Sequence, residues 1–267
     1  MQIGDLKINR FMIHYWVFGD KGPFIIYVNG AQQVMAVWKS VISRLSKDYR
    51  NLTFDFPGQG KSKILTGPLR VTFDEQIDIL QKILIANDAL DQLHIAGSSW
   101  GGLIAAAFAS KYPDKVKKLL LGSFGVKINQ KLKDIIERAH DLYALNAREE
   151  VGPFIIENFG MGLPEKYKQR IIHQFQKMSR ENVEIFYQHI LFVDSKKCID
   201  EFVDLEKIKA NTLIIYGQND SIIDFDDVEY ASSKIPHCKM KIIADTGHFL
   251  HFENEELIDI YVDFLSH

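Results

Sequence analysis

The chain has 267 residues, of which 46% are hydrophobic and 25% charged. This balance indicates a globular protein with one large core and room for an inserted segment. The formal net charge of −3 gives no reason to expect a nucleic acid or an anionic membrane surface as partner.

Predicted strands and helices alternate along the first part of the chain. Residues 11–18 are rich in aromatic and β-branched residues and predict a strand. Residues 24–28 form an unbroken apolar run, which is typical of a strand buried on both faces of a parallel sheet. Thr72 and Glu75 have the spacing of a capping box and predict the start of a helix. Further strands are expected at residues 51–56, 93–96 and 116–121, and further helices at 38–45 and 103–112.

This alternation stops after Phe124. Residues 126–205 show helical periodicity and no convincing strand. Strands are predicted again at 212–217 and 240–243, followed by a helix from about residue 253 to 264. We therefore expect a core of residues 1–125 and 206–267. A helical cap of residues 126–205, inserted after the sixth strand, would cover the sheet edge where ligands bind. The alternative is a set of packing helices that never contact ligand.

Residues 97–101 read Gly-Ser-Ser-Trp-Gly and fit the pattern Gly-x-Ser-x-Gly. In this pattern the serine occupies a strained turn between a strand and a helix, where neighbouring chain leaves room only for small residues on either side. A predicted strand ends at Ala96 and a helix follows, so the context is correct and Ser99 is the expected nucleophile. Ser98 is the rival, but its register would put Ala96 and Trp100 at the glycine positions.

A serine hydroxyl needs a base, and the sequence offers nine histidines. His248 follows the last predicted strand and precedes the last helix, so its loop lies at the carboxyl edge of the sheet. His251 is the nearest competitor and is expected in or against the last helix, pointing elsewhere. The strand residues His14 and His94 are expected to be structural, whereas three histidines of the cap are expected at its surface or in its pocket: His140, His173 and His189.

The base needs a carboxylate to hold its tautomer. Asp220 directly follows the buried strand at 212–217 and is the expected acid. Three acids that follow it closely are interpreted as helix N-terminal or solvated groups: Asp224, Asp226 and Asp227. For the oxyanion we expect two backbone N–H donors, those of Ala31 and Trp100.

With these residues in place, nearly the whole chain resembles the α/β-hydrolase superfamily with a helical cap. The order Ser99, Asp220, His248 is the order of that family's triad. Residues 55–62, Asp-Phe-Pro-Gly-Gln-Gly-Lys-Ser, are similar to the family's turn after the fourth strand. The resemblance implies a mostly parallel, eight-stranded sheet flanked by helices.

Shorter motifs resemble one acyltransferase branch of this superfamily. That branch includes the 3-(3-hydroxyalkanoyloxy)alkanoate synthase of rhamnolipid biosynthesis and the 3-hydroxyacyl-ACP:CoA transacylases. The likeness rests on residues 28–31, 99–102, 246–250, 235–238 and 163–164. Many superfamily members have His-Gly at the oxyanion loop, and this chain has Asn29-Gly30, as the branch does.

The sequence leaves several functions open. The first is hydrolysis of a carboxylic ester or thioester through an acyl-Ser99 intermediate. The second is acyl transfer from a 3-hydroxyacyl thioester to a hydroxyl or thiol, because the same triad serves both reactions. The third is a ligand receptor with vestigial catalysis. Cofactor-free peroxidation and C–C bond hydrolysis on the same fold also stay open.

Substrate contacts are expected from the oxyanion loop, the cap and the histidine loop, and we name Asn29, Gln32, Phe159, Phe186 and Phe249. The expected partner is a small acyl ester or thioester, with acyl carrier protein or CoA as further candidates; no cofactor, metal ligand set or nucleotide loop is visible. Two cysteines, Cys198 and Cys238, do not predict a disulfide scaffold. No secretory signal or membrane span is recognised, so we expect a cytoplasmic protein.

Overall fold

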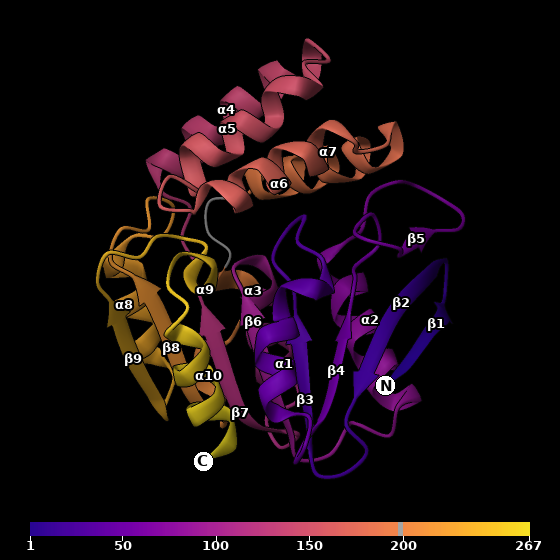
Figure 1. The fold of residues 1–267 in the computed structure, drawn as a ribbon, viewed down its shortest axis with the longest axis vertical. Coiled ribbons are helices and arrows are strands. Elements are labelled where there is room, and N and C mark those ends of the chain that lie inside the picture. The colour runs from indigo at the N-terminus through magenta and orange to yellow at the C-terminus, as the bar shows by residue number, and fades with distance from the viewer. Residues whose placement is uncertain (197–199) are drawn as a thin grey trace.

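The computed structural model describes residues 1–196 and 200–267, so Cys198 lies outside the described residues. Its centre is one sheet with the strand order β1-β2-β4-β3-β6-β7-β8-β9 (Figure 1). All pairs from β4 onward along this path are parallel, and β2 pairs antiparallel with both β1 and β4. The strands are β1 (Gln2–Ile8), β2 (Phe11–Phe18), β3 (Phe24–Val28), β4 (Arg50–Phe54), β6 (Leu93–Ser98), β7 (Val116–Gly122), β8 (Asn211–Gly217) and β9 (Cys238–Ile243).

Two strands of the sheet were not predicted from the sequence. The first, β1, alternates exposed and half-buried residues and carries Gly4 and Asp5, so its own pattern is weak and its pairing with β2 defines it. The second is the two-residue β5 (Lys63–Ile64), which pairs with β2 and makes the sheet nine-stranded. The mostly parallel sheet flanked by helices is confirmed.

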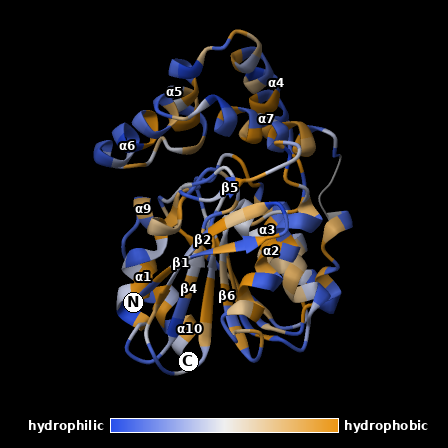
Figure 2. Cartoon of the chain, turned by 90° about the vertical axis from the view of Figure 1, so that its right-hand side faces the viewer, coloured by the Kyte–Doolittle hydropathy of each residue, from blue (hydrophilic) through white to orange (hydrophobic). Residues whose placement is uncertain are grey.

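Helices cover both faces of the sheet because side chains alternate along each strand. In β3, Ile26 and Val28 pack into the cluster under α2 (Phe73–Ala86), α3 (Trp100–Lys111) and α8 (Phe225–Lys234). Ile25 and Tyr27 face the opposite cluster, under α1 (Lys39–Leu45) and α10 (Leu257–Ser266). Figure 2 shows α1 on one side of the sheet and α2 with α3 on the other.

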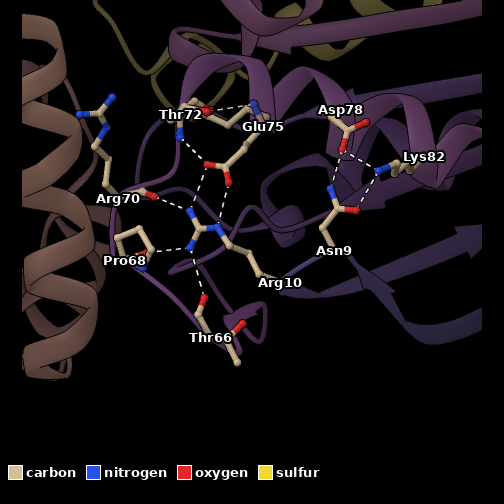
Figure 3. Close-up of polar contacts among 10 residues, drawn as sticks. Asn9, Arg10, Thr66, Pro68, Arg70, Thr72, Glu75, Asp78 and Lys82 are labelled. Atoms are coloured by element: carbon tan, nitrogen blue, oxygen red, sulfur yellow. Dashed lines mark hydrogen bonds and ion pairs between the residues drawn. The ribbon is translucent and has the colours of Figure 1, made fainter.

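The predicted capping box of α2 is confirmed, and it belongs to a larger polar cluster (Figure 3). Thr72 Oγ1 accepts from the Glu75 N–H, and Glu75 Oε2 accepts from the Thr72 N–H at 2.9 Å. The same carboxylate binds the Arg10 guanidinium, which also donates to the carbonyls of Pro68 and Arg70 at 2.6 Å each. The β1–β2 turn is thereby fastened to the start of α2.

The final helical region differs from the expectation for residues 253–264. It is divided into α9 (Leu250–Glu253) and α10, with Asn254 extended between them. The Glu253 carboxylate accepts from the N–H groups of Gly247 at 2.8 Å and Phe249 at 3.0 Å. This carboxylate therefore fixes the loop that carries His248.

In the described residues between β7 and β8, four α-helices lie above the carboxyl ends of the strands (Figures 1 and 2). We call them the cap helices: α4 (Gln130–Ala144), α5 (Arg148–Phe159), α6 (Glu165–Gln176) and α7 (Arg180–Asp194). Within the described part of the chain, no helix is long and apolar enough to cross a membrane.

Candidate active site

Ser99 sits in a strained turn between β6 and α3. Its backbone angles are φ 51° and ψ −122°, a left-handed region that non-glycine residues seldom adopt. A Cβ on Gly97 would lie 2.6 Å from the Gly101 carbonyl oxygen, and one on Gly101 would lie 2.3 Å from that of Val28. The close approach of neighbouring chain therefore requires both glycines.

Three side chains from separate loops meet at this turn. His248 Nε2 lies 3.1 Å from Ser99 Oγ, and His248 Nδ1 lies 2.8 Å from Asp220 Oδ2. Ser99 follows β6, Asp220 follows β8, and His248 lies in the loop after β9. Because these strands are parallel, their carboxyl ends bring the three loops to one edge. An imidazole held in this way can take a proton from the serine hydroxyl.

Electrostatic interactions favour the charged forms of Asp220 and His248. Burial alone would raise the pKa of the Asp220 carboxyl, but its interaction with His248 lowers this pKa. Two hydrogen bonds also lower it, because Asp220 Oδ1 accepts from the N–H groups of Ile222 at 2.9 Å and Ile223 at 3.1 Å. Burial alone would lower the pKa of His248, but Asp220 and the charge of Glu253 raise it above its ordinary value.

Among the described residues, the other histidines considered as the base form no hydrogen bond with Ser99. His251 is buried, its Nε2 contacts the Val37 carbonyl at 3.1 Å, and burial lowers its pKa to about 4. His14 Nδ1 lies 2.7 Å from Asp5 and His94 Nδ1 lies 3.1 Å from the Leu265 carbonyl. His140 contacts Tyr187 and Asp194, His173 is exposed, and His189 lines the cavity described below.

Asp227 lies in the first turn of α8, as one of the two interpretations predicted, but it is not solvated. Asp227 is buried, and its Oδ2 accepts from the N–H groups of Val126 and Lys127 at 2.7 and 2.8 Å. It therefore fixes the chain where it leaves β7. Asp224 is the N-cap residue of α8, and Asp226 lies in that helix's first turn.

The loop after β3 contributes Ala31 and Gln32 to the lining of the cavity that Ser99 also lines, which is described below. Gln32 has a positive φ of 59°. In the amide orientation that satisfies both of its polar atoms, Gln59 donates to the Gln33 carbonyl at 2.9 Å and accepts from the Gln32 N–H at 3.0 Å. The turn at residues 55–62 thereby supports the loop that carries the Ala31 amide.

Asn29, expected as a substrate contact, lies outside the cavity. Its side chain is buried and donates to the Phe54 carbonyl at 3.0 Å and to Asp55 at 3.2 Å. Its Oδ1 accepts from the Trp38 indole at 3.0 Å. Since both polar atoms are satisfied within the core, Asn29 supports the loop from behind.

A cavity of about 780 Å³ lies between the cap helices and the sheet edge. Ser99, Trp100 and His248 line its core side, and most of the remaining lining is apolar. It includes four residues expected to contact substrate: Gln32, Phe159, Phe186 and Phe249. The Phe159 ring lies 5.5 Å from the His248 ring, so an apolar ring shields the imidazole.

Other lining residues were not expected from the sequence. They include Tyr167, Arg170 and Gln174 of α6, Arg148 of α5 and the indole of Trp100. Gln174 Nε2 donates to the Gln32 carbonyl at 2.7 Å, and the Trp100 indole donates to Gln76 at 2.8 Å. Helical periodicity marks the inward faces of α6 and α5 but not what they face, so no local signal identified these side chains.

Among residues 1–196 and 200–267, no group of three or more His, Cys, Asp or Glu side chains has an arrangement that could hold a metal ion.

Comparisons with known proteins agree with this fold. The profile of the family described as "alpha/beta hydrolase fold" matches residues 23–131. An (R)-3-hydroxydecanoyl-ACP:CoA transacylase of Pseudomonas putida is 26% identical over 86% of this chain and 78% of its own. A 2-hydroxy-6-oxononadienedioate/2-hydroxy-6-oxononatrienedioate hydrolase of the same species is 24% identical over 100% of this chain and 95% of its own.

The solved structures agree as well. An alpha/beta hydrolase enzyme from a Medee basin deep-sea metagenome library has a TM-score of 0.85 at 20% identity, covering 99% of this chain and 98% of that one. The chain therefore has the α/β-hydrolase fold, and the relatives it resembles in sequence include a transacylase and a hydrolase.

Proposed function

We propose that the protein is a serine-dependent acyl enzyme that acts on carboxylic esters or thioesters through an acyl-Ser99 intermediate. The observation that carries this proposal is the hydrogen-bonded series from Ser99 Oγ through His248 to Asp220, at 3.1 and 2.8 Å, on the floor of an apolar cavity. We also propose that residues 126–205 act as the substrate-binding cap.

In the proposed first step, His248 Nε2 takes the Ser99 proton while Oγ attacks the substrate carbonyl. The N–H groups of Ala31 and Trp100 stabilise the oxyanion, a contribution of about 3 kcal/mol by comparison with measured oxyanion-hole losses. The carbonyl re-forms as the bond to the leaving group breaks, and His248 returns its proton to that group. In the second step His248 removes a proton from the acceptor, which attacks the acyl carbonyl. The bond between the acyl group and Ser99 Oγ then breaks, and His248 returns the proton to Oγ.

The acceptor decides between two reactions. Water gives an esterase or thioesterase, whereas a hydroxyl or thiol gives an acyltransferase. Two observations favour transfer from a 3-hydroxyacyl thioester as the second candidate: the similarity to the transacylase and the charge on α6. Helix α6 has three Lys or Arg residues against one acidic residue, and Lys177 follows it directly, in a chain with a net charge of −3.

The charges on α6 lie beside the cavity. Lys166, Arg170 and Lys177 have spacings of four and seven residues and so share one side of the helix. In the described residues none of the three is in an ion pair. Their neighbours Tyr167 and Gln174 line the cavity. This basic side of α6 supports the proposal that an acidic acyl carrier protein or CoA brings the acyl group.

The experiment compares p-nitrophenyl esters of graded chain length with 3-hydroxyacyl thioesters, each with and without an acceptor thiol or hydroxy acid. Product release that depends on Ser99 supports the acyl enzyme, and faster release with acceptor identifies a transferase. Tight ligand binding without turnover, unchanged in Ser99→Ala, would instead indicate a receptor. Turnover by Ser99→Ala at the wild-type rate would refute the proposal.

A further inference from the structure

His189 of α7 lies next to the proposed reaction centre. It lines the cavity, and its ring stands edge-on to the Trp100 ring with the centroids 4.3 Å apart and an interplanar angle of 87°. Trp100 directly follows Ser99 in the chain and carries one of the two proposed oxyanion amides. The part of the cavity that lies beside the Trp100 ring is therefore also beside His189.

The imidazole of His189 has no hydrogen-bond or ion-pair partner among the described residues. Its nitrogens are also not among the fully buried side-chain atoms that lack a partner, and the residue lines the cavity. Other polar side chains nearby are satisfied: the Ser123 hydroxyl donates to the His248 carbonyl at 2.7 Å, and Gln33 Oε1 accepts from the Gly30 N–H at 3.0 Å. A polar group left open in an apolar cavity is a site for a ligand's hydrogen bond.

The protonation state of this imidazole limits what it can bind. Burial lowers the pKa of His189 to about 4, so the ring is neutral at physiological pH. A neutral imidazole has one N–H donor and one acceptor nitrogen. A hydroxyl group matches both, because it also donates one hydrogen and accepts another. A carboxylate can only accept and an ammonium group can only donate.

We infer that His189 binds a hydroxyl group on the acyl chain, close to the reacting carbonyl, and makes the site selective for hydroxyacyl substrates. This inference rests on the proposed acyl function, since it places the acyl chain beside Trp100. Apolar cavity walls alone would accept a plain acyl chain equally well, so we attribute the selectivity for a hydroxyl group beside Trp100 to this side chain.

A binding measurement tests the inference separately from catalysis. Calorimetry compares decanoic acid with its 2-hydroxy and 3-hydroxy derivatives on Ser99→Ala and on the same variant with His189→Phe. We expect Ser99→Ala to bind one hydroxy acid about tenfold more tightly than decanoic acid, as expected for one hydrogen bond to a buried partner. We expect His189→Phe to bring that ratio close to one. Equal affinity for all three acids, or a preference that persists in His189→Phe, would overturn the inference.

Turnover provides the second readout. With the matching thioesters, the ratio of kcat/KM for hydroxyacyl to plain acyl should fall about tenfold in His189→Phe. His189→Gln, which keeps a donor and an acceptor, should recover part of the ratio. His173→Phe, an exposed cap histidine outside the cavity, should leave it unchanged. Failure of the wild type to cleave any ester would refute the proposed function, whereas cleavage without hydroxyl preference would refute only the role of His189.

Discussion

Gln174 Nε2 of the cap donates a hydrogen bond of 2.7 Å to the main-chain carbonyl of Gln32. This contact joins α6 to the loop after β3, which carries the proposed oxyanion amide of Ala31. The position of the cap and the geometry of the reaction centre are therefore connected by a side chain that lines the cavity.

Replacing Gln174 with leucine removes this contact at similar side-chain volume. A single hydrogen bond contributes about 0.5–1.5 kcal/mol, so we expect kcat/KM to fall by about three- to tenfold. Because the contact is exposed, the free energy of unfolding should change by less than about 0.5 kcal/mol. Gln169→Leu is the control, since Gln169 bonds only to Glu165 within α6. Equal activity losses in both variants would show that the contact with Gln32 does not matter.

The pH dependence of activity follows from the pKa of His248. The base must be neutral to accept the Ser99 proton, and Asp220 holds its pKa above the ordinary value. We expect kcat/KM to rise with pH through an apparent pKa above that of a free histidine. Asp220→Asn removes the charge that raises the pKa of His248. The apparent pKa of the pH profile should therefore shift to a lower pH for the activity that remains. We expect the kcat of Asp220→Asn to be lower by about four orders of magnitude. A pH profile that does not move in Asp220→Asn would contradict this account of the pair.

The turn at Ser99 predicts a stability difference between adjacent glycines. A Cβ on Gly101 would lie 2.3 and 2.4 Å from the carbonyl oxygens of Val28 and Asn29, and main chain cannot move aside cheaply. We expect Gly101→Ala to lose about 1–3 kcal/mol or more of unfolding free energy. At Gly102 the nearest atom would be a Phe124 ring carbon at 3.4 Å, so Gly102→Ala should be far milder. Thermal or urea denaturation of the two variants measures the difference, and similar losses would argue against the close approach.

The basic side of α6 predicts a charge effect that depends on the acyl donor. Lys166→Glu with Lys177→Glu should weaken turnover of a carrier-protein thioester, and low salt should enlarge the difference. The same variant should cleave p-nitrophenyl esters at a rate close to that of the wild type.

The matched control is Lys117→Glu with Lys239→Glu. It makes the same change of charge at exposed residues near the amino ends of β7 and β9, away from the cavity. Equal effects of the two charge changes on the carrier-bound substrate would contradict docking at α6.

The sequence was sufficient to predict that Ser99, Asp220 and His248 meet, but not which cap side chains line the cavity. Ser99, Asp220 and His248 each follow a recognisable parallel strand, and this topology alone brings their loops to one edge. Asn29 also follows such a strand, but position along the chain does not say which way a side chain turns, and this one turns into the core. For His189 the sequence left open whether it lies at the surface of the cap or in its pocket, because only the packing of α7 against Trp100 decides between the two.

The most direct test of the central claim is the mass of the protein after brief mixing with a p-nitrophenyl ester. We expect one added acyl group per chain, located on Ser99 by peptide mapping, lost in Ser99→Ala and formed much more slowly in His248→Ala. Ser98→Ala and His251→Ala should still form the adduct, although His251→Ala loses a buried side chain and some stability. An acyl group on any other residue, or wild-type turnover by Ser99→Ala, would contradict the account.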